Sequence, residues 1–176
     1  MTEEQVYATV EKVGNIELRA YDPCVIAEIA VEGSFEGAGN KAFRPLVSFI
    51  GGRNQTGKKV AMTAPVIQDV PDGRADGNEY VVSFVMPAGS TRDDMPDPTD
   101  TRVQLRAVPA HEALAIRFSG RWTASSFSKN LATLENAAKE RGLQLIGDPR
   151  LARYDPPWTP WFRRRNEVVW TVAPSE

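Results

Sequence analysis

The sequence repeats one pattern at a fixed offset, and this repeat constrains the fold more than any other feature. Residues 16–20 read Ile-Glu-Leu-Arg-Ala, and residues 103–107 read Val-Gln-Leu-Arg-Ala, an offset of 87 residues. The same offset pairs further residues: Ile29 with Ile116, Gly33 with Gly120, Phe35 with Trp122, Val82 with Val169 and Pro87 with Pro174. Several matches at one offset indicate an internal duplication. We expect repeats at about 16–87 and 103–174, with Phe35 and Trp122 as equivalent anchors beneath their helices.

Each half has the pattern strand, strand, helix, strand, strand. Apolar periodicity predicts helices at 34–50 and 125–141, and strands at 16–21, 24–31, 59–68, 79–86, 102–108, 111–118, 150–154 and 166–173. One helix covers only part of a sheet's apolar face, so the two halves must pack together. The sequence predicts one α+β domain over residues 1–176. Eight strands and two helices would be related by a pseudo-twofold axis.

The first helix has clear end signals. Ser34 is a suitable N-cap, Glu36 falls in the first turn, and Gly51 and Gly52 follow the last apolar position. Pro45 lies inside the pattern, and we expect it to kink the helix because its ring opposes an earlier carbonyl.

Residues 59–66 read Lys-Val-Ala-Met-Thr-Ala-Pro-Val. Pro65 lacks a backbone donor, so a strand that holds it must be interrupted there. The repeat offset drifts to 91 in this region, where Pro65 matches Pro156. We therefore expect two similar clefts, one in each half, of which one or neither is used.

Composition excludes several classes of function. The net charge of −2 gives no nucleic-acid footprint, and no apolar run reaches the roughly 20 residues of a membrane span. The first residues are acidic and lack an apolar segment, which argues against a signal peptide. A single cysteine, Cys24, forms no internal disulfide, so we expect a cytoplasmic protein in which Cys24 is a small buried hydrophobe.

The residue content gives little support for a catalytic site or a metal-binding site. His111 is the only histidine and Cys24 the only cysteine, which excludes the usual zinc spacings and makes a nucleophilic triad hard to build. A lone histidine at a strand start is usually exposed to solvent or has its hydrogen bonds satisfied by neighbouring groups, and is not a ligand or a base. We predict no catalytic and no metal-binding residues.

A hydrophobic, planar small molecule is the ligand that the residues favour. Aromatic and methionine side chains suit such a ligand because they are polarizable and adaptable. Lysines near them can pair with acidic substituents. The candidate binding residues are Phe43, Lys58, Lys59, Met62, Met86 and Trp158. The same residues also suit a different arrangement, with the apolar ones in the core and the lysines on a solvated face.

Several motifs, in one order, resemble the SOUL family of haem-binding proteins. They are the segments at 16–21, 49–52, 59–66, 81–87, 118–120 and 154–168, so the resemblance covers about residues 6–173. It implies a distorted antiparallel β-barrel flanked by two helices. It also implies a soluble carrier or buffer of haem or another tetrapyrrole, a binding protein rather than an enzyme.

The residues proposed to contact haem in this family are replaced here. A histidine proposed as axial ligand corresponds to Ala20, and the charged partners of the haem propionates correspond to Asn40, Ser48 and Thr159. The resemblance therefore implies binding mainly through apolar contact, with Phe43 kept on the helix, and with help from other cations.

Two alternatives have different functions. The duplicated halves also resemble the effector-binding modules of bacterial multidrug regulators, some relatives of which are hydrolases. In that case an acid such as Glu112 or Glu167 would select or act on a small molecule. The second alternative is a protein–protein interaction module with a vestigial pocket.

Overall fold

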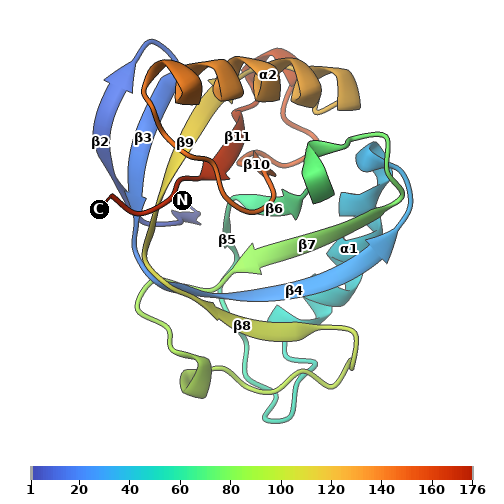
Figure 1. Cartoon of the computed structure of the whole chain (residues 1–176). Coiled ribbons are helices and arrows are strands. Elements are labelled where there is room, and N and C mark those ends of the chain that lie inside the picture. Colours follow the sequence, from blue (N-terminus) through green and yellow to red (C-terminus); the bar gives the residue numbers. More distant parts are fainter. Residues whose placement is uncertain (1, 176) are drawn as a thin grey trace.

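A computed structural model describes residues 2–175 and shows a mixed α+β fold with one large antiparallel sheet and two helices (Figure 1). The sheet has nine strands in a spatial order that differs from the chain order. From edge to edge they are β2 (Tyr7–Val13), β3 (Ile16–Tyr21), β9 (His111–Phe118), β11 (Asn166–Thr171), β10 (Arg150–Arg153), β6 (Val66–Asp69), β7 (Glu79–Val85), β4 (Cys24–Glu32) and β8 (Gln104–Val108). The short strands β1 (Glu3–Glu4) and β5 (Thr63–Ala64) pair separately and in parallel.

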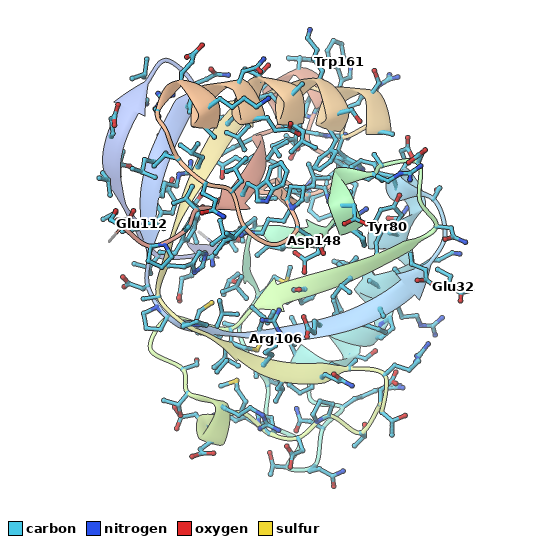
Figure 2. All side chains as sticks on the ribbon, in the orientation of Figure 1. Glu32, Tyr80, Arg106, Glu112, Asp148 and Trp161 are labelled. Carbon is cyan, nitrogen blue, oxygen red and sulfur yellow. The ribbon has the colours of Figure 1, made fainter. Side chains whose placement is uncertain are left out.

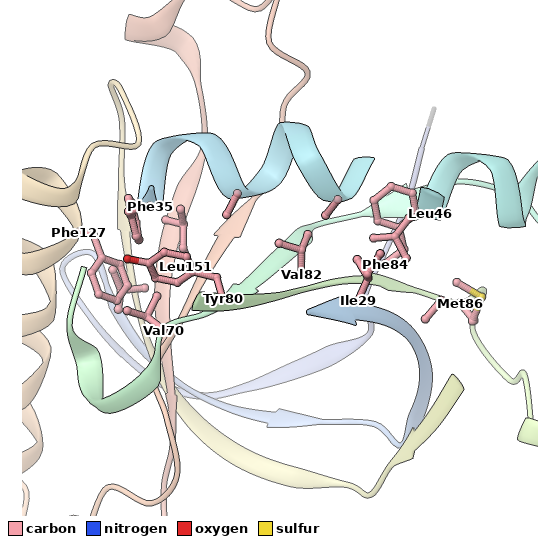
Figure 3. Packing of buried hydrophobic residues seen from close by; sticks show 14 of the residues in the cluster. Ile29, Phe35, Leu46, Val70, Tyr80, Val82, Phe84, Met86, Phe127 and Leu151 are labelled. Carbon is pink, nitrogen blue, oxygen red and sulfur yellow. The ribbon is translucent and has the colours of Figure 1, made fainter. Parts of the chain in front are cut away.

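The helices α1 (Phe35–Ile50) and α2 (Ala124–Glu140) share one hydrophobic core with the sheet. α1 packs on β4 and β7, and α2 packs on β9 and β11. Phe35, at the start of α1, meets Phe127 of α2 with 5.2 Å between ring centroids, and Tyr80 of β7 with 5.9 Å (Figure 3). The two halves therefore bury their apolar faces together, as the sequence predicts.

The predicted end signals of the helices are confirmed, with one shift. The Ser34 hydroxyl accepts a hydrogen bond from the Gly37 amide at 3.0 Å, and α1 runs without interruption through Pro45 to Ile50. Gly52 follows with a φ of 113°, a conformation that favours glycine. α2 begins at Ala124 rather than 125, because Thr123 accepts from the Ser126 amide and is the N-cap.

The predicted strand at 59–68 is wrong over its first four residues. Residues 59–62 are instead bonded to the C-terminal end of α1, where the Val60 amide donates to the Ile50 carbonyl at 2.7 Å. The buried Asn54 side chain donates to the Phe49 and Lys58 carbonyls at 3.1 and 2.7 Å. These bonds tie the segment to the end of α1 and use the Val60 amide, and strand pairing begins only at Thr63.

The predicted equivalence of Pro65 and Pro156 is also wrong. β6 and β10 run antiparallel with Val66 opposite Arg153. Pro65 precedes β6 and Pro156 follows β10, so both prolines lie at the same end of this strand pair. The two segments thus adjoin one another and do not form two separate, symmetry-related clefts.

Phe35 and Trp122 do not have equivalent roles. Phe35 is only 2% exposed and is the first residue of α1, after the N-cap. Trp122 precedes the N-cap Thr123 and is half-buried, with the guanidinium groups of Arg153 and Arg164 over its ring. Phe127 is the aromatic residue of α2 that meets Phe35 in the core.

Within residues 2–175, no helix is both long and apolar enough to cross a membrane.

Replacing Phe35 by alanine should lower the free energy of unfolding by about 3–5 kcal/mol, because the change empties a large buried aromatic site. Trp122→Ala should cost about 1–2 kcal/mol, since this ring is partly solvated already. Urea unfolding of both variants measures the difference. Equal losses would show that the two aromatics anchor their helices alike.

Candidate functional site

Phe43 is an exposed aromatic side chain placed directly against the core. It is 50% exposed on α1, yet its ring lies 5.9 Å from that of Phe84, which is 2% exposed on β7. Its neighbours Ala42 and Leu46 face inward and are fully buried. Because α1 is fixed by that buried face, Phe43 offers a rigid apolar surface to a ligand.

One turn before Phe43, Gly39 makes room for an arginine from the sheet. A Cβ atom on Gly39 would lie 1.9 Å from Nη2 of Arg153, which comes from β10. The Arg153 guanidinium also covers Trp122, with 5.0 Å from Cζ to the ring centroid. The Arg153 guanidinium can lie against the backbone of α1 only because residue 39 has no side chain.

Arg153 is a poorly solvated cation that lacks an anionic partner. Within residues 2–175 it makes no hydrogen bond through its side chain and no ion pair. Burial lowers the pKa of Arg153 to about 10, and the side chain remains charged at neutral pH. A buried guanidinium without a carboxylate is a favourable site for one, because desolvated ion pairs form strong hydrogen bonds.

The loop 154–165 is held beside this arginine. The Arg164 guanidinium lies 4.2 Å from the Trp122 centroid and donates to the Thr159 and Pro157 carbonyls at 2.9 and 2.7 Å. We call Gly39, Phe43, Trp122, Arg153 and Arg164 the α1 surface. Three exposed aromatics extend from the loop next to it: Trp158, Trp161 and Phe162. Trp161 stands at the outer edge of the molecule in Figure 2.

The structure separates several of the candidate residues. Met86 is 2% exposed and belongs to the core, as Figure 3 shows, while Trp158 is 84% exposed. Lys58 donates to the Asp94 carbonyl at 3.3 Å, beyond the C-terminal end of α1, and Lys59 is exposed next to it. Met62 is 37% exposed, directly before β5.

Gly39 and Arg153 were missed by sequence reasoning. A glycine inside an amphipathic helix often marks a close approach, so Gly39 carried a usable signal. Arg153 carried none, because only the pairing of β10 with β6 brings it beside α1.

The residues that replace the proposed haem contacts of the family are spread over the molecule. Asn40 is exposed on α1, next to Gly39, and Thr159 lies in the loop that Arg164 holds. Ser48 lies farther along α1 in a shallow pocket with Arg44 and Arg53. Ala20 lies on β3, opposite Glu112 of β9.

His111 lies on the sheet face opposite the helices, and both of its ring nitrogens have hydrogen-bond partners. Nη2 of Arg150 lies 3.2 Å from His111 Nε2, and the Pro109 carbonyl lies 3.0 Å from Nδ1. Arginine only donates, so Nε2 accepts and Nδ1 carries the proton. Burial lowers the pKa of His111; the bond to the Pro109 carbonyl opposes this shift, and the neighbouring Arg150 adds to it.

Glu167 is fully buried in an ion-pair cluster on that same face. Both of its oxygens accept from Arg19 at 2.7 Å, and Oε2 also accepts from Arg165 at 3.1 Å. Burial alone would raise the pKa of Glu167, but the bonds and charges of the two arginines lower it. Its carboxylate is already fully engaged by protein groups, and Glu112 lies apart, near the start of the inner strand β9 (Figure 2).

Comparison with known proteins identifies the family. The profile described as "SOUL heme-binding protein" matches residues 2–171. The chain belongs to this family. It is 27% identical to "Heme-binding protein 2" of Homo sapiens over 168 residues, 93% of this chain and 80% of that protein. It is 26% identical to "Heme-binding protein 1" of Bos taurus, over 77% of this chain and 71% of that protein.

A solved structure shares the fold of this SOUL protein. The C-terminal domain of EcmrR superposes with a TM-score of 0.70 and 15% identity, over 96% of this chain and 98% of that domain.

Breaking the buried cluster should be costly. Arg19→Met should lower the free energy of unfolding by about 3–5 kcal/mol, because it leaves the Glu167 carboxylate buried without its main partner. The matched control is Arg106→Met: this half-exposed arginine pairs with Glu28 and should cost only about 0–1 kcal/mol. Urea unfolding at pH 7 measures both, and similar losses would contradict the account.

The same cluster predicts a pH dependence. The folded pKa of Glu167 lies below its unfolded value of 4.5, so the ionised carboxylate stabilises the fold above that pH. This contribution is lost as the pH falls through the lowered folded pKa. Glu167→Gln should therefore be destabilising at pH 7 and much less so at pH 3. A constant difference between the two pH values would show that the ion pair does not stabilise the protein.

Proposed function

We propose that this SOUL protein binds haem or another planar tetrapyrrole on the α1 surface and acts as a carrier or buffer. Family membership supports the class of ligand, since the relatives are named heme-binding proteins. The observation that carries the proposal is the juxtaposition of two groups: an exposed, rigid Phe43 ring and, one turn away, the unpartnered Arg153.

These two groups match the two parts of a tetrapyrrole. The Phe43 ring would contact the macrocycle face, and Arg153 would pair with a carboxylate at its rim. Met62, Lys59 and Trp158 are proposed outer contacts, because all three are exposed. Met86, which is buried, is not among them. His111 is engaged on the opposite sheet face, so binding rests on apolar contact and Arg153 rather than on a histidine–iron bond.

Removing Phe43 should weaken haem binding at least fivefold, because the macrocycle loses its rigid apolar contact. A Soret-band titration of Phe43→Ala measures this, with circular dichroism to confirm folding. Val10→Ala, at an exposed apolar residue on the edge strand β2, is the control and should bind as the unaltered protein does. His111→Ala should also bind normally. Loss of the haem spectrum in His111→Ala with normal binding by Phe43→Ala would overturn the placement.

The role of Arg153 can be tested from the ligand side. The unaltered protein should bind haem at least fivefold more tightly than haem dimethyl ester, which lacks the free carboxylates. Arg153→Gln should abolish this preference. Gly39→Ala should reduce it as well, because the new methyl group displaces the guanidinium. Equal affinity of the unaltered protein for both ligands would exclude Arg153 as a carboxylate partner.

We also infer that the two halves arose by duplication and form a distorted barrel. The sheet order β3-β9-β11-β10 is mirrored by β8-β4-β7-β6. Tyr21 opposite His111 corresponds, at the offset of 87, to Val108 opposite Cys24. Both observations support a single domain with a pseudo-twofold axis between β6 and β10.

A further inference from the structure

The sheet face opposite the helices contains a cavity, which is separate from the α1 surface and independent of the function proposed there. Its volume is about 270 Å³, below the roughly 300–1,000 Å³ of sites for drug-sized ligands. The floor is apolar, with Ile26, Ile67 and Val108. Polar side chains from several strands surround it, among them Asp69, Ser83 and Arg150. The size and the lining suit a small amphipathic molecule.

Ser83 is a buried hydroxyl in the cavity wall without a partner. It lies on β7, opposite Ile67 of β6, and is 1% exposed. Among residues 2–175, its Oγ makes no hydrogen bond. A buried polar group in this state is destabilising unless something else satisfies it. Ser83 therefore points to a ligand with a hydrogen-bonding group at this place.

Asp69 and Arg150 are direct cross-strand neighbours that do not pair with each other. They are opposite residues of β6 and β10, yet no ion pair joins them within residues 2–175. Nor does the Asp69 carboxylate accept a hydrogen bond from the part of the chain that the structure describes. Arg150 donates to Thr171 Oγ1 and to His111, both at 3.2 Å, which leaves its other donors without protein partners there. A negative and a positive group thus line one cavity side by side, each incompletely satisfied.

The remaining charged groups around the cavity are already balanced. Arg106 at the rim is held in a two-bond fork by Glu28, with both distances 3.1 Å. His111 is neutral, and burial raises the pKa of the Cys24 thiol, which keeps that group neutral too. Asp69 and Arg150 are therefore the two charges available to a ligand.

We propose that this cavity binds a small zwitterion, an amino acid with an apolar side chain. Its ammonium group would contact Asp69 and the Ser83 hydroxyl, and its carboxylate would pair with Arg150. The side chain would lie on Ile26, Ile67 and Val108. A ligand with one charge only would satisfy one of the two groups and leave the other unpaired.

Isothermal titration calorimetry with three matched probes tests the proposal. L-leucine carries both charges, 3-methylbutylamine lacks the carboxylate, and 4-methylpentanoate lacks the ammonium group. L-leucine should saturate at one equivalent and bind at least tenfold more tightly than either analogue. No binding of L-leucine or L-phenylalanine at 10 mM would overturn the proposal, as would equal affinity for an analogue with a single charge.

Two variants assign the contacts. Asp69→Asn should weaken L-leucine binding at least tenfold but leave the binding of 4-methylpentanoate unchanged. Arg150→Gln should also weaken L-leucine binding at least tenfold but leave the binding of 3-methylbutylamine unchanged. Asp100→Asn, at an acid paired with Arg102 elsewhere on the surface, is the control and should bind normally. Unchanged L-leucine binding in both cavity variants would also overturn the assignment. Circular dichroism confirms that each variant is folded.

Proton linkage gives an independent readout. Burial raises the pKa of Asp69 to about 6; Glu28 and Asp148 raise it, and Arg150 and Arg106 oppose the shift. An ammonium group requires the ionised carboxylate, so L-leucine affinity should fall about tenfold between pH 7 and pH 5. Asp69→Asn should remove this dependence. A pH dependence that persists in Asp69→Asn would place the ammonium group elsewhere.

Discussion

The fold depends on the contact that joins its two halves beneath the helices. Phe35 of α1 and Phe127 of α2 meet in the core, with Tyr80 against Phe35. Each helix covers only its own part of the sheet, so neither half could bury its apolar strands alone. This shared core fixes α1 against β4 and β7, and the positions of Gly39 and Phe43 follow from it.

The two faces of the sheet have different chemistry. The face beneath the helices is apolar, and Arg153 is a cation at its margin, between α1 and the loop 154–165. The opposite face carries ionic groups. Two arginines of this face differ in burial: Arg19 is buried and bound to Glu167, whereas Arg106 is half-exposed and bound to Glu28. One part of this face is therefore filled by an ion-pair cluster, while another part contains a cavity.

The different chemistry of the two faces explains why the two proposed functions fall on different faces. A planar ligand needs an exposed, rigid apolar surface, which α1 provides through Phe43. A small zwitterion needs two neighbouring opposite charges that do not pair with each other, which β6 and β10 provide through Asp69 and Arg150. Glu167, an acid that sequence reasoning considered for small-molecule selection, is neutralised by Arg19 and Arg165 and has no free oxygen for a ligand.

The sequence by itself determined most of the elements, the caps of the first helix and the family, because these depend on local patterns. Ser34, Gly52 and the alternation in β4 could be interpreted without knowing any distant contact. Strand order and side-chain partners were decided only by the tertiary structure. Arg153 lies beside Gly39, Pro65 lies beside the segment after β10, and Ser83 lacks a partner because of strand pairings between distant parts of the chain. No local pattern encodes such neighbours, so the candidate site was only partly predictable: Phe43 was found, and Arg153 was not.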